Sequence, residues 1–204
     1  MIECEGERLD SHERLRRLLS AIIDEPERRT ELSDQIMTEF TRRCAVMVLD
    51  MSGFSRTTQV HGVVSFLLMI HQMRLLAVPS IEVCGGTLVK AEADNLYCIF
   101  PETAAAVKAA REIMRRLETV NPLLPAGRRL YASIGIGFGD ILLLDDQDLF
   151  GDEVNLASKL GEDVAQSGMI TLTDSARAAL SDEAPSAPER ASISGLAITY
   201  HVVG

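Results

Sequence analysis

The sequence predicts an α/β sandwich with a ferredoxin-like βαββαβ core, extra C-terminal strands and an N-terminal helical segment. Short apolar runs of strand length alternate with longer segments of helical periodicity in the order strand–helix–strand–strand–helix–strand. Of the 204 residues, 47% are hydrophobic and 25% are charged, which is ordinary for a globular protein. No internal repeat or low-complexity tract interrupts this pattern.

The N-terminal segment differs in pattern from the rest of the chain. Residues 10–42 are expected to form two helices, because apolar residues recur there at helical spacing. Ser11 suits the N-cap of the first helix, and Pro26 suits the first position of the second. We interpret residues 1–43 as an appendage for packing or dimerisation, and 44–204 as the main domain.

The elements of the main domain follow from apolar runs and the residues that break them. In order, we expect a strand from Ala45 to Leu49, a helix over 58–78, strands over 87–91 and 96–100 joined by a turn at Asp94-Asn95, a helix over 102–119, a strand pair formed by Leu130–Ile136 and Ile141–Leu144, a helix over 153–165, a strand from Met169 to Thr173, a short helix capped by Asp174, a loop over 181–190, and terminal strands within 193–203.

Composition excludes several classes of partner. The net charge of −10 argues against duplex nucleic acid and anionic membranes, because both favour basic patches. We expect no membrane-spanning helix, because no run approaches the roughly 20 apolar residues that one needs. The N-terminus is charged and does not resemble a signal peptide. The four cysteines form no CxxC pair, which suits a reducing compartment and disfavours a zinc site. We expect a cytoplasmic protein without membrane or nucleic-acid partners.

Two aspartates stand where chemistry is expected. Asp50 ends a buried strand, and Asp94 lies on a hairpin; adjacent strands would bring both to one edge. An aspartate at a strand end can also cap the helix that follows. For Asp50 taken alone, helix capping explains the residue as well as ligand binding does. Two close carboxylates repel unless cations lie between them, and an open set of oxygen ligands suits Mg²⁺ or Mn²⁺. The backbone N–H groups at the start of the next helix would hold phosphates; they belong to Met51, Ser52, Gly53 and Phe54.

Other phosphate and catalytic motifs do not explain these residues. The sequence has no GxxxxGK[ST], HExxH or GxSxG motif. The glycines of residues 135–139 superficially suit a dinucleotide loop, but a strand and not a helix follows them, so we reject that interpretation.

Four segments then occur in a fixed order: residues 50–55 (DMSGFS), 85–94 (GGTLVKAEAD), 134–140 (IGIGFGD) and 150–160 (FGDEVNLASKL). Together they resemble the motif series of class III nucleotidyl cyclase catalytic domains, over roughly residues 44–203. Each motif alone is weak, but four in order are a specific signal. The resemblance implies a head-to-tail homodimer with its active sites at the subunit interface.

The resemblance also assigns roles to individual residues. Asp50 and Asp94 would bind two metal ions, Mg²⁺ or Mn²⁺, that activate the ribose 3′-hydroxyl and hold the triphosphate. Lys90 and Asp148 match the residues that read the purine, and a lysine donor beside an aspartate acceptor fits adenine, which favours ATP. Asn155 would orient the ribose. Without the resemblance, Lys90 is an exposed strand lysine and Asp148 a loop carboxylate.

Three departures from the family pattern lie around the phosphates. Lys159 replaces the arginine that stabilises the transition state, which keeps the charge but loses the planar fork. Ala93 replaces a glycine, and Ser133 an arginine. The first hypothesis is therefore an enzyme that makes 3′,5′-cyclic AMP from ATP; the second is a cyclase-like regulatory module that binds nucleotide or a partner with little turnover. A cyclase for another base is a third.

Overall fold

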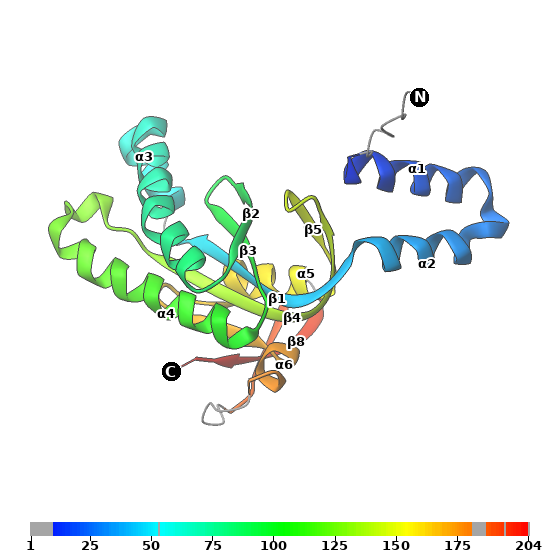
Figure 1. The fold of residues 1–204 in the computed structure, drawn as a ribbon. Helices are drawn as coiled ribbons and strands as arrows, with labels where there is room; N and C mark the ends of the chain where they lie inside the picture. Colours follow the sequence, from blue (N-terminus) through cyan, green and yellow to red (C-terminus); the bar gives the residue numbers. More distant parts are fainter. Residues whose placement is uncertain (1–9, 53, 181–186, 194, 204) are drawn as a thin grey trace.

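A computed structural model describes residues 10–52, 54–180, 187–193 and 195–203. Within these residues, eight strands form one mixed sheet in the order β2-β3-β1-β4-β6-β8-β7, and β5 pairs with β4 (Figure 1). The predicted α/β fold class and its βαββαβ core are confirmed. From the N-terminus the elements are α1 (Ser11–Asp24), η1 (Pro26–Arg28), α2 (Arg29–Phe40), β1 (Thr41–Met51), α3 (Phe54–Val83), β2 (Thr87–Glu92), β3 (Asn95–Phe100), α4 (Thr103–Val120), η2 (Asn121–Leu123), η3 (Ala126–Arg128), β4 (Ala132–Leu144), β5 (Asp148–Phe150), α5 (Asp152–Lys159), η4 (Leu160–Val164), β6 (Ile170–Thr173), α6 (Asp174–Ala178), β7 (Glu189–Ile193) and β8 (Leu196–Val202).

Strand β1 lies at the centre of the sheet and faces two helical layers. It pairs antiparallel with β3 on one side and with β4 on the other. Side chains of a strand alternate between its faces. Ala45, Met47 and Leu49 join the core beneath α3 and α4, whereas Val46 and Val48 join a second core with α5. The near-continuous apolar run of β1 is therefore explained by burial on both faces.

Strand β4 is a single element, which corrects the predicted strand pair of Leu130–Ile136 and Ile141–Leu144. It pairs with β1 along the whole of β1, and its last three residues also pair with β5. The glycines in its middle do not make a turn. A Cβ atom added at Gly135 would lie 2.1 Å from the Ala157 carbonyl oxygen, and one at Gly137 would lie 2.7 Å from the Glu153 carbonyl oxygen. These glycines let α5 pack directly on the strand.

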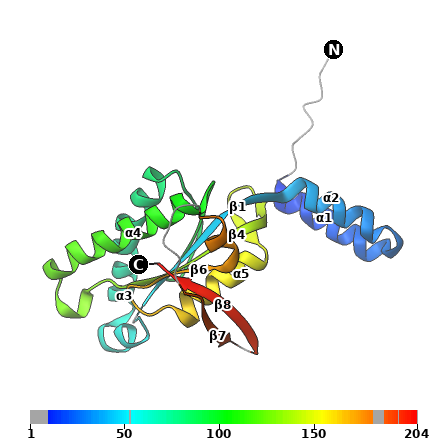
Figure 2. The ribbon, with the colours of Figure 1, turned by 90° about the horizontal axis from the view of Figure 1, so that it is seen from below.

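The N-terminal helices form a hairpin that projects from one end of the sheet (Figures 1 and 2). Both predicted helices are present, but Asp10, not Ser11, is the N-cap, because its carboxylate accepts from the His12 N–H group. Pro26 begins a short 3-10 turn before α2. Strand β1 starts at Thr41, so it begins inside the segment interpreted as an appendage.

Three smaller predictions need correction. The turn between β2 and β3 lies at Ala93-Asp94 rather than at Asp94-Asn95, since Glu92 pairs with Asn95. Thr173, not Asp174, caps α6 through its hydroxyl group. The predicted loop over 181–190 ends earlier than expected, because β7 already begins at Glu189; residues 181–186 of it lie outside the described residues.

Helix α3 is more apolar and less covered than expected. It is interrupted at Gly62, where φ is 78° and ψ is 165°. Within the segment Gly62–Val83, a window of 18 residues has a mean hydropathy of 1.5, and 22% of that window is buried. By length and composition alone, this segment is long and apolar enough to cross a membrane. The prediction that no run approaches the length of a spanning helix is therefore wrong. Its buried side, including Met73 and Ile81, packs on the sheet, while its other side is exposed.

Candidate active site

Asp50 and Asp94 lie at the same edge of the sheet. Asp50 is the penultimate residue of β1 and is half-buried. Leu49 pairs with Leu96 of the neighbouring β3, so the β2–β3 turn that carries Asp94 lies beside Asp50. The register of the central strands thus produces the juxtaposition that the sequence analysis inferred from topology.

Four carboxylates gather at this edge. Burial is the largest cause of a rise in the pKa of Asp50, and together with the carboxylates of Asp94, Glu162 and Asp163 it raises that pKa to about 7. Burial also raises the pKa of Glu162, with help from Asp163 and Asp94. The Asn95 side-chain amide donates to Glu162 at 2.8 Å, which connects the β2–β3 hairpin to the η4 turn. Negative charge is therefore concentrated here at a cost that a cation would relieve.

The donor chemistry of this edge suits hard divalent cations. Asp50 and Asp94 offer only carboxylate oxygens, which are the ligands of Mg²⁺ and Mn²⁺, and leave room for phosphate oxygens. Among the described residues, no group of three or more His, Cys, Asp or Glu side chains is arranged to enclose an ion. The two aspartates fit ions that are completed by a bound polyphosphate rather than by the protein.

The predicted phosphate loop is only partly available. Met51 ends β1 with a buried side chain, and α3 begins at Phe54. The Ser52 N–H group already donates to the Tyr131 carbonyl oxygen at 3.0 Å, so in this conformation it does not face a ligand. The Ser52 hydroxyl lies 3.1 Å from the hydroxyl of Ser133, which is buried. Gly53 lies outside the described residues.

Ser133 therefore supports the loop from below. It stands opposite Asp50 in the β1–β4 ladder and is 2% exposed. A side chain in this position does not reach a phosphate, so the family's arginine contact has no direct substitute at Ser133.

The structure brings Lys90 and Asp148 together. The Lys90 ammonium lies 2.9 Å from the Asp148 carboxylate and 3.2 Å from Glu92. It also lies 4.9 Å from the centroid of the Tyr97 ring, within cation–π range. Partial burial lowers the pKa of Lys90, but its hydrogen bonds to Asp148 and Glu92 outweigh burial, so the pKa is raised. The pair thus places a hydrogen-bond donor directly beside an acceptor.

Asn155 and Lys159 line one cavity of about 720 Å³. They are four residues apart on α5, so they lie on the same face of the helix. Glu153 fixes this helix: its carboxylate accepts from the Phe138 N–H group at 3.1 Å and from the Thr173 hydroxyl at 2.7 Å. The cavity is also lined by Asp152, Leu156, Ser158, Glu162, Asp163 and Ala197.

Sequence reasoning missed four acidic residues around these groups. Glu162 and Asp163 follow Lys159 closely, and that spacing was the available signal, since residues three or four apart share a helix face. Glu92 pairs with Lys90 two residues before it on the same strand, and that spacing was the available signal. Glu153 carried no signal, because its partners Phe138 and Thr173 come from other strands.

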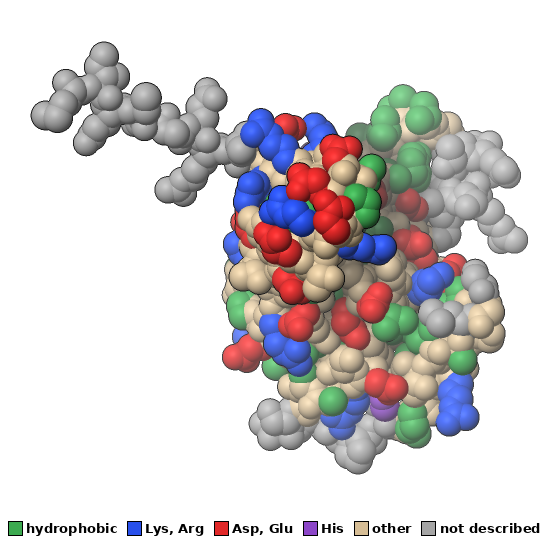
Figure 3. All heavy atoms as spheres, turned by 90° about the vertical axis from the view of Figure 1, so that its right-hand side faces the viewer, with side chains coloured by type: hydrophobic (Ala, Val, Ile, Leu, Met, Phe, Trp, Pro, Cys, Tyr) green, Lys and Arg blue, Asp and Glu red, His purple; other side chains and the backbone are tan. Residues whose placement is uncertain are grey.

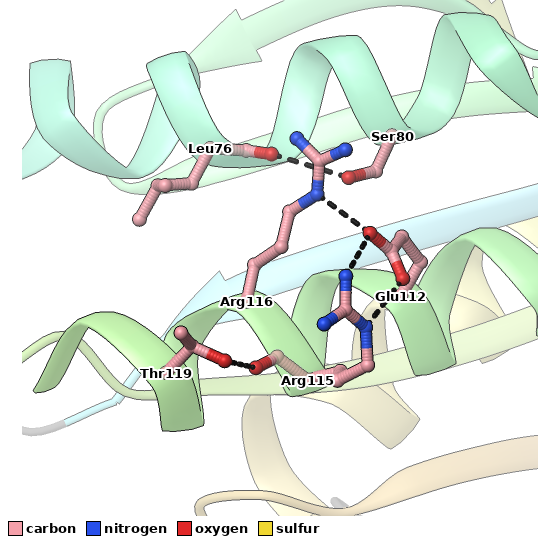
Figure 4. Close-up of polar contacts among 6 residues, drawn as sticks. All are labelled: Leu76, Ser80, Glu112, Arg115, Arg116 and Thr119. Atoms are coloured by element: carbon pink, nitrogen blue, oxygen red, sulfur yellow. Dashed lines mark hydrogen bonds and ion pairs between the residues drawn. The ribbon is translucent and has the colours of Figure 1, made fainter.

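A second cavity, of about 620 Å³, lies between α3 and α4 and contains none of the predicted site residues. On its wall Glu112 accepts hydrogen bonds from Arg115 and Arg116, each at 2.8 Å (Figure 4). Glu112 thus offsets the positive charge of Arg115 and Arg116 within α4. We assign no function to this cavity.

Comparison with known proteins identifies the fold. The crystal structure of an adenylate/guanylate cyclase/hydrolase from Silicibacter pomeroyi superposes with a TM-score of 0.65, at 29% sequence identity, over 79% of this chain and 95% of that chain. This chain has the class III nucleotidyl cyclase catalytic-domain fold. The catalytic core of a rhodopsin-guanylyl cyclase with converted specificity, solved in complex with ATPalphaS, has a TM-score of 0.69 at 19% identity over 80% of this chain and 98% of that chain.

One curated relative extends the similarity to sequence. The protein named "Putative adenylate cyclase 3" from Rhizobium meliloti (strain 1021) is 27% identical over 133 residues, which is 65% of this chain. The chain spans 22% of that relative's length. No family model matches the chain.

Proposed function

We propose that this cyclase domain converts ATP to 3′,5′-cyclic AMP and pyrophosphate, with Mg²⁺ or Mn²⁺, at sites shared between the two subunits of a homodimer. The observation that carries the proposal is the Lys90–Asp148 pair, in which the ammonium nitrogen and a carboxylate oxygen are 2.9 Å apart. The same chain also brings Asp50 and Asp94 together at one edge of the sheet. One group of residues suits a purine, and the other suits a metal-bound triphosphate.

Each residue has a defined task in the proposed reaction. Lys90 would donate a hydrogen bond to N1 of adenine, and Asp148 would accept one from its amino group. Guanine reverses donor and acceptor on this edge, so the pair favours ATP. Asn155 would hold the ribose, and Lys159 would bring positive charge to the phosphate oxygens as charge develops there.

The bond changes are those of an internal phosphoryl transfer. The ribose 3′-oxygen forms a bond to the α-phosphorus and gives up its proton to water, while the bond from the α-phosphorus to the bridging oxygen breaks and pyrophosphate leaves with the bonding electrons. Two divalent ions held by Asp50 and Asp94 would acidify the 3′-hydroxyl and neutralise charge on the phosphates. Without such cations the four neighbouring carboxylates would repel a triphosphate.

An exposed apolar face on α3 supports the dimer. Four aliphatic side chains of α3 are each more than half exposed, and they lie just after the interruption of the helix at Gly62: Val63, Val64, Leu67 and Leu68. Contiguous exposed aliphatic side chains are typical of surfaces that another molecule covers. A second copy placed against this face would lie next to the metal edge, as a shared site requires.

A regulatory module with little turnover is the second candidate. Lys159 lacks the guanidinium fork, and Ser133 is buried beneath the loop instead of facing a phosphate. Ala93, beside Asp94, occupies a left-handed conformation with φ of 49°, which an alanine adopts at a cost. All three features weaken the phosphate side of the site while leaving base recognition intact.

The test is incubation of the purified protein with each of the four nucleoside triphosphates and Mn²⁺, with cyclic products identified by mass. Formation of cyclic AMP from ATP, and of no other cyclic product, supports the proposal. Formation of a different cyclic nucleotide would mean that the substrate is another triphosphate. No product, with nucleotide still bound, supports the regulatory module.

Sharing of the site is tested by mixing two variants. Asp50→Ala and Lys159→Ala chains are each expected to be inactive or nearly so, and their mixture should regain activity because one intact site forms per mixed dimer. A mixture as inactive as its components, beside an active wild type, contradicts a shared site.

A further inference from the structure

The N-terminal helical hairpin is tied to the turn between β4 and β5. The Asp145 carboxylate accepts hydrogen bonds from the Ser11 N–H group at 2.8 Å and from the Ser11 hydroxyl at 2.5 Å. These bonds lower the pKa of Asp145. Figures 1 and 2 both show the turn beside the first turn of α1. A helix start that lacks internal partners is thus satisfied by a carboxylate 134 residues away in sequence.

An apolar contact reinforces this tie. Leu144, the last residue of β4, is 2% exposed and belongs to the core of the hairpin. Arg42 adds a longer ion contact to Asp146, with 3.8 Å between the charged atoms. The hairpin residues that pack with Leu144 are Leu18, Leu32, Ile36 and Phe40. The turn is therefore held by the hairpin on both its polar and its apolar side.

The same turn holds the purine-reading aspartate. Leu144 pairs directly with Asp148 in the β4–β5 ladder. Asp145 and Asp146 have φ of 47° and 53°, a left-handed conformation that disfavours residues other than glycine. Strained turns persist where surrounding contacts hold them. The turn has one backbone hydrogen bond of its own, from the Gln147 N–H group to the Leu144 carbonyl oxygen at 2.8 Å. The Ser11 and Leu144 contacts hold it from outside, three residues from Asp148.

We propose that the α1–α2 hairpin positions Asp148, and with it the Lys90–Asp148 pair, and that Ser11 and Asp145 are the positioning residues. The role of Asp148 in reading the base rests on the proposed function; the mechanical link does not. The outward surface of the hairpin carries interleaved basic and acidic side chains, as Figure 3 shows, and several form local ion pairs such as Arg17 with Glu13. Its inward contact with the turn is where it acts on the site.

Two variants break the tie without removing the elements that it joins. Ser11→Pro deletes both donors, yet Ser11 is the first residue of α1, where proline is well accepted, and Asp10 already has the extended backbone that precedes proline. Asp145→Gly deletes the acceptor and relieves the positive φ, so the turn itself is favoured. The matched control is Arg28→Ala, which removes ion pairs to Glu25 and Glu31 at the far end of the hairpin.

The first measurement is hydrogen exchange of the peptide covering residues 142–151, in the protein without nucleotide. Both variants should exchange faster there than wild type, and Arg28→Ala should not. Unchanged exchange in both variants would overturn the proposed link.

The second measurement is calorimetric affinity, with Mn²⁺ present, for α,β-methylene-ATP and for inorganic tripolyphosphate. Loss of the tie should weaken the nucleotide about three- to tenfold, the effect of one or two hydrogen bonds, and leave tripolyphosphate unchanged, because it has no base. Equal weakening of both ligands would overturn the positioning role in favour of a general effect on stability. Wild type that binds neither ligand would contradict the proposed function, while the exchange measurement still decides whether the hairpin holds Asp148.

Discussion

The two halves of the candidate site carry charge in opposite ways. At the metal half, burial and three neighbouring carboxylates oppose the ionisation of Asp50. Lys159 opposes the rise in the pKa of Glu162 but does not reverse it. At the base half, Lys90 and Asp148 neutralise one another at 2.9 Å. The first half gains stability when ions bind, whereas the second must exchange an internal partner for a ligand. Ion binding and base selection are therefore separable by experiment.

The largest expected effect comes from Lys159, which faces the same cavity as Asn155. Lys159→Ala should lower kcat on the order of 100-fold and leave nucleotide affinity nearly unchanged, because the charge acts mainly in the transition state. Lys159→Arg should hold or raise kcat. Steady-state rates and nucleotide titrations measure both. Lys108→Ala on α4 is the control and should be silent; two silent Lys159 variants in an active protein would remove Lys159 from the mechanism.

Asp50 should make stability depend on pH in an unusual direction. Its pKa is about 7 in the folded chain, above the ordinary 3.8, so the folded state binds more protons between these values. Stability should be fullest below about pH 4, fall as the pH rises toward 7, and level off above it. In metal-free buffer, Asp50→Asn should be more stable than wild type at pH 8 by roughly 1–3 kcal/mol, after discounting for partial exposure, and equal near pH 4.

Denaturant unfolding with chelator at both pH values measures this difference. Added Mn²⁺ should stabilise wild type and have less effect on Asp50→Asn, because the variant lacks a ligand. A variant less stable than wild type at pH 8 would show that the metal half is not strained.

At the base half, Asp148→Asn should reduce selectivity rather than stability. An amide can present either an acceptor or donors, so discrimination between adenine and guanine should fall about tenfold, in the range of one charged hydrogen bond. Competition titrations of ATP against GTP measure the ratio. Asp140→Asn, which alters an exposed pair with Arg43, is the control. An unchanged ratio would separate Asp148 from base recognition.

The smallest effect concerns the turn that carries Asp94. Ala93→Gly should stabilise the protein by about 1 kcal/mol, because φ at this position is 49° and glycine adopts it without strain. Ala91→Gly, in the adjoining strand β2, should instead destabilise it. Thermal unfolding compares the two, and the same sign for both would show that the turn is not strained.

The sequence by itself determined the order of strands and helices. Through the order and spacing of its motifs, and their resemblance to a family, it also predicted as site residues Asp50, Asp94, Lys90, Asp148, Asn155 and Lys159. These depend on local periodicity and on motif spacing, both of which can be read along the chain. One error was local too: the chain was expected to divide into two strands around Gly137 and Gly139, although the glycines of this segment mark the close packing of α5 on a single strand, β4.

Only the tertiary structure decided which charges surround each site residue. Glu162 and Asp163 lie near Asp50, and Glu92 forms a second ion pair with Lys90. The N–H group of Ser52 donates to the carbonyl oxygen of Tyr131. The tie between Ser11 and Asp145 joins residues 134 positions apart, so no local pattern indicates it. Such contacts exist because the sheet brings distant segments to one edge. Burial then strengthens the electrostatic interactions between their charges. A one-dimensional pattern carries neither the distance nor the desolvation.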